Sequence, residues 1–148
     1  MQIRTISVSV SASRDTVFNF LANIENLPKW ATEFCERLEL RRGRWWAYTS
    51  RGEMLVELSA HDGTGVIDLC AGPAPDRLGL LPIRVLPLPG GGSLVSVTLV
   101  QAAGFSDESF DVLYQGLLAE LRGFLRRFGG GEVHVPDASP SWAELGRN

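Results

Sequence analysis

Residues 105–131 read FSDESFDVLYQGLLAELRGFLRRFGGG, a pattern that predicts one long amphipathic helix. Ser106 is suited to cap its N-terminus, two carboxylates follow in the first turn, and Gly129–Gly131 end it. A helix of about 22 residues spans roughly 33 Å at 1.5 Å per residue, so it is long enough to lie across a whole sheet. Its apolar face repeats every three or four residues and comprises Phe110, Leu113, Leu117, Leu121, Phe124 and Phe128.

A strand and two short helices are predicted nearer the N-terminus. Residues 3–10 alternate between apolar and polar side chains, which indicates a strand. Ser13 can cap a first helix, and Asn26 can cap a second, short one. Trp30 and Phe34 are four residues apart, so we expect them to share one face of the short helix.

Six further strands are predicted between these helices and the long one. Tight turns at Arg51-Gly52 and Asp62-Gly63 separate some of them, and the glycine-rich segment at 89–92 separates two others. Consecutive strands joined by such turns form an antiparallel meander. The predicted strands are residues 37–41, 44–50, 53–60, 65–71, 78–88 and 93–101.

The order of these elements predicts an α+β fold. A curved antiparallel sheet of about six to seven strands, covered by one long helix, encloses a concave apolar space between its two layers. Spaces of this kind are where small ligands usually bind. A chain of 148 residues suits a single domain, which we place at residues 1–130. Residues 131–148 form a tail with Trp142 as its one large apolar anchor.

Three segments resemble the START/Bet v 1-like (SRPBCC) superfamily, in particular its bacterial polyketide cyclase/dehydrase-like branch. They are ISVSVSASRDTVFNFLANIENLPKW at 6–30, the hairpin-rich middle, and GFSDESF with its helix at 104–128. The resemblance implies a helix-grip fold in which two short helices close one end of a cavity and the C-terminal helix forms its lid. It puts Trp30 and Phe34 at the entrance or wall of a pocket; the alternative is that both only pin the short helix to the sheet.

Two-residue turns at the predicted positions set a register for the central hairpins. Glu57 would then lie opposite Asp68, on a face shared with Trp46 and Tyr48. Burial of two carboxylates would be costly, so this face is expected on the outside. A one-residue slip would instead turn these groups into the cavity and provide acid–base chemistry. The opposite, apolar face comprises Trp45, Ala47, Thr49, Met54, Val56, Leu58, Ala60, Ile67 and Leu69.

Composition excludes several classes of function. The net charge is −3 with a pI near 5.4, so no basic field attracts nucleic acid. No apolar run approaches a membrane span and no signal peptide is evident, so we expect a cytoplasmic protein without integral membrane association. The only histidines are His61 and His134, and Cys35 and Cys70 are far apart. We therefore expect no metal, no cofactor and no thiol nucleophile.

The leading hypothesis is that the protein binds, and in doing so transports or sequesters, a small hydrophobic or aromatic molecule or lipid between the sheet and the C-terminal helix. The predicted lining residues are Trp30, Phe34, Trp45, Met54, Val56, Leu58, Leu69, Phe110, Leu113 and Leu117.

One alternative is a polyketide cyclase or aromatase. Its polar candidates are Glu33, Tyr48, Glu57, Asp68 and Tyr114, and none matches a motif that identifies a catalytic residue. A third hypothesis is a protein-interaction module, with a homodimer formed through Trp46 and Tyr48.

Overall fold

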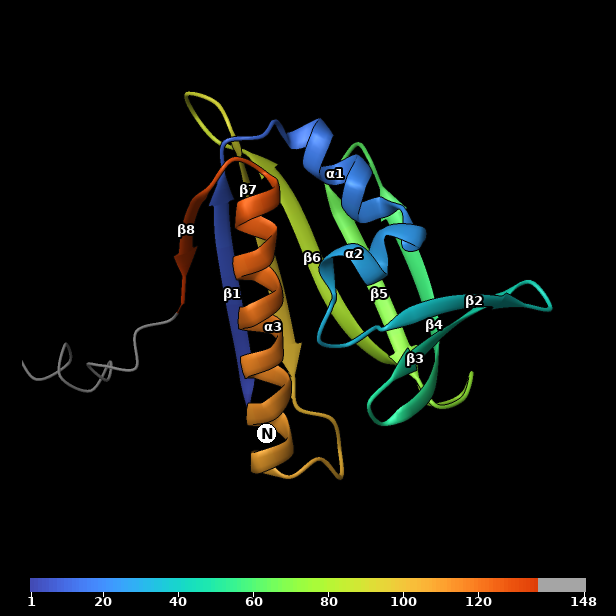
Figure 1. Ribbon diagram of the computed structural model, residues 1–148. Coiled ribbons are helices and arrows are strands. Elements are labelled where there is room, and N and C mark those ends of the chain that lie inside the picture. The colour runs from blue at the N-terminus through green and yellow to red at the C-terminus, as the bar shows by residue number, and fades with distance from the viewer. Residues whose placement is uncertain (136–148) are drawn as a thin grey trace, which may run out of the picture.

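The computed structural model, which describes residues 1–135, shows a curved eight-stranded sheet with a long helix along one half of it (Figure 1). All neighbouring strands are antiparallel, in the order β2-β3-β4-β5-β6-β7-β1-β8. The predicted α+β, helix-grip architecture is therefore confirmed. The strands are β1 (Ile3–Val10), β2 (Arg37–Arg41), β3 (Arg44–Thr49), β4 (Gly52–His61), β5 (Val66–Gly72), β6 (Gly79–Pro87), β7 (Ser93–Val100) and β8 (Gly131–His134).

The long helix α3 (Asp107–Arg127) begins and ends close to its predicted limits. The Ser106 hydroxyl accepts a hydrogen bond from the amide of Ser109 at 3.0 Å, which confirms the predicted N-cap. The axis of α3 runs along β1 and β7. The other half of the sheet curves away from α3 toward the β2–β3 hairpin (Figure 1). No helix within residues 1–135 has the length and apolar character needed to cross a bilayer.

The segment after β1 is more broken than the sequence indicated. It contains α1 (Arg14–Ala22), the 3₁₀ helix η1 (Ile24–Asn26) and the four-residue α2 (Leu27–Trp30). Ser13 caps α1 as predicted. Asn26 does not cap α2 with its side chain, which instead donates to the carbonyl oxygen of Phe20 at 2.9 Å.

Because α2 ends at Trp30, Phe34 lies beyond it, and the predicted shared helical face does not form. The physical reason is a competing partner for the backbone. The amides of Glu33 and Phe34 both donate to the carboxylate of Glu120 on α3, at 3.1 Å each. Together with bonds from the amides of Phe34 and Cys35 to the carbonyl of Ala31, they hold residues 31–36, which we call the connector, in a turn rather than a regular helix.

The predicted hairpin registers are wrong by two residues. Thr49 pairs with Gly52 because its hydroxyl closes a Ser50-Arg51 turn, accepting from the amide of Arg51 and donating to the carbonyl of Gly52. The next turn has four residues, 62–65, rather than two, so Glu57 pairs with Cys70 and Ser59 with Asp68. A shift of two keeps every side chain on its predicted face, so the division of faces is confirmed.

The inner face of the sheet and the facing helices form one continuous apolar core. Ala47, Val56, Ile67 and Leu69 on the inner face are each at most 4% exposed. The outer face has one buried apolar residue that the sequence analysis missed. Leu55 pairs with Gly72, where an added Cβ would collide with the backbone of Arg77, so residues 73–78 fold back over this part of the sheet.

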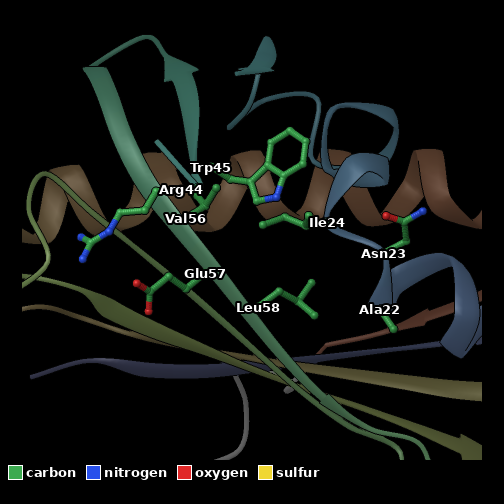
Figure 2. Close-up of a pocket in the computed structure, with 9 residues that line it drawn as sticks. Ala22, Asn23, Ile24, Arg44, Trp45, Val56, Glu57 and Leu58 are labelled. Atoms are coloured by element: carbon green, nitrogen blue, oxygen red, sulfur yellow. The ribbon is translucent and has the colours of Figure 1, made fainter. Parts of the chain in front are cut away.

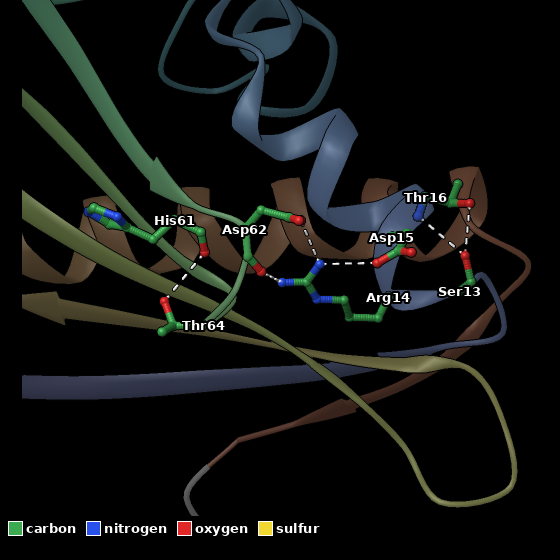
Figure 3. A network of polar contacts seen from close by, with 7 residues as sticks. All are labelled: Ser13, Arg14, Asp15, Thr16, His61, Asp62 and Thr64. Carbon is green, nitrogen blue, oxygen red and sulfur yellow. Dashed lines mark hydrogen bonds and ion pairs between the residues drawn. The ribbon is translucent and has the colours of Figure 1, made fainter.

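A polar network fixes α1 against the β4–β5 turn (Figure 3). The guanidinium of Arg14 donates to the Asp62 carboxylate at 2.8 Å, to the Asp62 carbonyl, and to the Asp15 carboxylate at 3.0 Å. It also lies over the ring of Phe18, 4.6 Å from its centre. Charged contacts therefore set the position of the N-terminal half of α1 relative to the sheet.

Residues directly after α3 form a strand that the sequence did not indicate. Residues 131–134 make β8, which pairs with β1, and Val8 lies opposite Val133. Gly131 has φ +150°, and a Cβ there would collide with the carbonyl of Ser9, so this close approach requires glycine. The predicted anchor Trp142 lies outside the described residues.

Candidate functional site

A hollow of about 440 Å³ opens on the inner side of the sheet, between the β3–β4 hairpin and the junction of α1 with η1. Trp45 and Leu58 from the sheet face Ile24 from η1 across it (Figure 2). Trp45, Leu58 and Ile24 are all half-buried. The lining residues are Ala22, Asn23, Ile24, Gly43, Arg44, Trp45, Val56, Glu57 and Leu58.

The polar groups of this first hollow lie at its margin. The side chains of Arg44 and Glu57 point away from the apolar walls, and Asn23 lies at the opposite end (Figure 2). The indole edge that carries the ring nitrogen of Trp45 faces Ile24 (Figure 2). The hollow therefore combines an apolar wall with polar groups at its ends.

The structure divides the ten predicted lining residues between different places. Trp45, Val56 and Leu58 line the first hollow. Trp30 lines a second hollow, described below. The remaining six line neither: Phe34, Met54, Leu69, Phe110, Leu113 and Leu117. Of these, Leu69 and Leu117 are at most 5% exposed within the apolar core, and Phe110 is 1% exposed outside that cluster, near the guanidinium of Arg4.

The candidate acid–base residues lie mostly away from the interior. Glu57 is exposed and Asp68 half-buried, both on the outer face, and they are not directly opposite each other. Tyr48 also lies on that face, and its hydroxyl donates to Glu39. Tyr114 is buried, with the guanidinium of Arg4 over its ring at 4.7 Å.

Arginine side chains cover the outer aromatic residues. Arg41 lies 4.8 Å from the ring centre of Trp46, and Arg37 lies 4.0 Å from that of Tyr48. Arg41 also pairs with Glu53 at 2.9 Å. Trp46 and Tyr48 are half-buried by these contacts rather than fully open to solvent.

A second hollow of about 420 Å³ lies between α2 and the C-terminal half of α3. Its lining combines aromatic and cationic residues with one buried carboxylate, Glu120, which is 6% exposed. Both hydrogen bonds from the connector end on Oε2 of this carboxylate. Within residues 1–135 the other oxygen, Oε1, accepts no hydrogen bond and is not sealed from solvent. The lining residues are Lys29, Trp30, Thr32, Glu120, Gly123, Phe124, Arg126 and Arg127.

Burial raises the pKa of Glu120 from 4.5 to about 7, against the two amide donors that lower it; nearby Glu33 raises it further. This carboxyl group therefore changes protonation close to neutral pH. Glu120 was not predicted as a functional residue, although the sequence contains a signal for it. Glu120 lies three residues after Leu117 and four before Phe124, so it interrupts the apolar face of the predicted helix.

The thiol of Cys35 lies close to this carboxylate and is 1% exposed. Burial, with the Glu120 charge as a second cause, raises the pKa of Cys35 to about 11. The group is therefore a protonated, buried thiol rather than a nucleophile at neutral pH. Within residues 1–135, no group of three or more His, Cys, Asp or Glu side chains is arranged to hold a metal ion.

No family model matches the chain, and no curated protein matches it. The chain does match solved structures. An uncharacterised protein from Bacillus thuringiensis superposes with a TM-score of 0.68 at 18% identity, covering 86% of this chain and 98% of that one.

Two other similar structures have more informative names. A START superfamily protein from Mycobacterium smegmatis superposes with a TM-score of 0.62 at 13% identity, over 85% of this chain and 96% of that one. The Aha1 dimer from Colwellia psychrerythraea gives a TM-score of 0.59 at 11% identity, over 86% and 94%. At these identities the similarity shows that the chain shares their fold.

Proposed function

We propose that the protein binds a small hydrophobic or aromatic molecule, with the first hollow as the entry to its site. The observation that carries this proposal is the wall made by Trp45, Val56 and Leu58, all of them predicted as lining residues from sequence alone. A large aromatic ring at a partly open position on the inner face provides contact area that the protein does not use itself.

Burial of apolar surface supplies the binding free energy. An aromatic molecule that loses about 150 Å² of apolar surface gains roughly 4 kcal/mol at 25 cal/mol per Å². A gain of about 4 kcal/mol corresponds to a Kd of about 1 mM, and ordering costs reduce it, so we expect millimolar affinity at best for a probe that buries only this area; a larger aromatic probe binds more tightly. The interior residues Met54, Leu69, Phe110, Leu113 and Leu117 contact the ligand only if it reaches beyond the hollow, between sheet and α3.

Two other hypotheses have less support. A cyclase or aromatase of the polyketide type needs ionisable groups inside the cavity. The Glu57 carboxylate lies at the margin of the first hollow and points away from its apolar walls, and Asp68 lies on the outer face. An interaction module formed through Trp46 and Tyr48 needs an open aromatic surface, and arginines cover both rings. Binding and carriage of an apolar molecule, including a lipid, requires neither feature. A homodimer stays a prediction, which a native mass spectrum checks.

Titration with N-phenyl-1-naphthylamine tests the proposal, because this neutral aromatic probe has no charge for the cations of the second hollow to attract. We expect Leu58→Trp, which fills the first hollow, to weaken probe binding at least tenfold. Leu80→Trp is the control, since Leu80 lies on β6, pairs with Cys70 on the outer face, is 52% exposed and does not line the hollow. Equal binding by a folded Leu58→Trp variant would place the site elsewhere.

A parallel variant locates the depth of the ligand. Leu117→Trp alters the interior face of α3 and leaves the walls of the first hollow intact. Loss of binding in both variants would show that the ligand spans the hollow and the interior, whereas loss in Leu58→Trp alone would confine it to the hollow. Native mass spectra of the freshly purified protein then identify any molecule that it retains.

A further inference from the structure

The second hollow contains two residues whose presence costs stability. Glu120 is a carboxylate held at 6% exposure, with its pKa raised by burial. A glutamine there could accept the same two amide hydrogen bonds without a charge to bury. Holding the connector in place therefore does not by itself explain a glutamate.

Gly123 is the other such residue, because glycine inside a helix is less stable than alanine by roughly 0.5–1 kcal/mol. A Cβ at this position would meet only Nη2 of Arg126, at 3.7 Å, so core packing does not demand glycine. The missing side chain does leave room in the hollow, which Gly123 lines. Glu120 and Gly123 are three residues apart and lie on the same face of α3. Two residues that lower the stability of the protein, Glu120 and Gly123, therefore line the same hollow.

Charge is unevenly distributed over this hollow. Lys29, Arg126 and Arg127 contribute cationic groups, and the buried carboxylate of Glu120 belongs to the same lining. Arg127 is partly engaged, since its guanidinium lies 4.9 Å from the ring centre of Phe20. An inorganic anion would use the cations but would be repelled by an ionised Glu120. A purely apolar molecule would leave both kinds of group without partners.

We propose that the second hollow is a separate binding site for a small organic anion that also carries a hydroxyl or amino group. The anionic end pairs with Lys29 and Arg126 at the rim. The hydroxyl or amino group donates a hydrogen bond to Oε1 of Glu120, which has no partner among residues 1–135. The body of the ligand occupies the space over Gly123.

Three simple probes separate these contacts: 4-hydroxybenzoate carries both groups, benzoate lacks the hydroxyl, and phenol lacks the carboxylate. Titration of the ¹⁵N-labelled protein would follow the amides of Glu33, Phe34 and Gly123. We expect 4-hydroxybenzoate to shift these amides and to bind about tenfold more tightly than either partial probe, the usual effect of one charge-assisted hydrogen bond.

Substitutions then assign the two contacts. Arg126→Gln should weaken 4-hydroxybenzoate about tenfold and leave phenol unchanged. Arg122→Gln is its matched control, because Arg122 is exposed on the same helix and does not line the hollow. Glu120→Gln should bring the affinities of 4-hydroxybenzoate and benzoate within about twofold of each other, since a neutral amide acceptor lacks the charge that strengthens the hydrogen bond.

Several results would overturn this assignment. One is the absence of millimolar binding by 4-hydroxybenzoate to the wild-type protein. Others are shifts confined to residues 22–24 and 44–45 of the first hollow, or equal affinities for the three probes. The wild-type comparison alone decides the matter if Glu120→Gln does not fold. A negative result with 4-hydroxybenzoate does not affect the result with N-phenyl-1-naphthylamine, because that probe tests the first hollow.

Discussion

Replacing Glu120 with glutamine should make the folded protein more stable at pH 8 while changing it little at pH 5. The carboxyl group is buried, and its second oxygen has no partner among the described residues. Glutamine has nearly the same shape and keeps an acceptor for the amides of Glu33 and Phe34. The substitution therefore removes the charge and retains the contacts of the connector.

The raised pKa of Glu120 determines the sign and the size of the pH-dependent change in the free energy of unfolding. A folded-state pKa of about 7, against 4.5 in the unfolded chain, means that the folded protein binds the Glu120 proton more tightly. Stability from this group is fully present below pH 4.5 and is lost as the pH rises through 7. At 1.36 kcal/mol per pKa unit, the loss reaches about 3 kcal/mol. We expect Glu120→Gln to recover 1 to 3 kcal/mol of it above pH 8, a rough range that allows for stronger hydrogen bonding by the charged form.

Urea unfolding of both proteins between pH 4.5 and pH 8.5 measures the effect. The difference between the two free energies of unfolding is the relevant quantity, because all other titrating groups cancel in it. The charged neighbours to consider are Lys29, Glu33, Arg126 and Arg127. Glu36→Gln is the control, since Glu36 lies in the same connector but is exposed. Glu36→Gln should not reproduce the gain in the free energy of unfolding that Glu120→Gln gives at pH 8.

Two outcomes would refute this reasoning. A ¹³C titration that gives Glu120 a midpoint below pH 5 would show that the cations of the hollow outweigh burial. A Glu120→Gln protein that is less stable than wild type by more than about 2 kcal/mol at pH 8 would show that the ionised carboxylate holds the connector in a way that an amide does not.

Two further predictions test the fold around these sites. Gly65→Ala should destabilise the protein by about 2 kcal/mol or more in urea unfolding, because Gly65 has φ +71° and a Cβ there would collide with the carbonyl oxygen of Val85. Gly63→Ala, in the same turn but facing open space, should change stability by no more than about 0.5 kcal/mol, and equal effects would contradict this account of the turn. Cys35 should resist Ellman's reagent at pH 8 in the native protein, since burial raises its pKa to about 11 and only about one thiol in a thousand is ionised. Rapid native labelling of Cys35, identified by peptide mapping, would show that the connector opens.

Periodicity predicted the architecture because it depends on local signals. The apolar repeat from Phe110 to Phe128 defined α3, and alternation defined the two faces of β3–β5. Periodicity did not predict the exact strand registers, since these depend on side-chain hydrogen bonds within the turns. The hydroxyl of Thr49 closes a turn one residue earlier than the glycine at 52 indicated.

The candidate sites show a similar limit. Trp45, Val56 and Leu58 were predictable, since all three lie on one apolar face. Glu120 was not, because its role arises from a contact with residues that are 86 and 87 positions away in sequence. A charge within an apolar stripe marks such a residue, yet the stripe alone does not reveal its partners.

The two hollows are lined by different residues of one continuous segment, residues 22–32, and this arrangement has a thermodynamic consequence. Residues 22–24 line the first hollow, and residues 29, 30 and 32 line the second. The segment between them has only a short 3₁₀ helix and one turn of α-helix. A donor bound at Oε1 of Glu120 stabilises the ionised carboxylate, and its other oxygen holds the connector. Filling the second hollow should therefore make residues 22–32 more rigid and lower the ordering cost of binding in the first. Because such coupling is reciprocal, a ligand in the first hollow must favour binding in the second by the same factor.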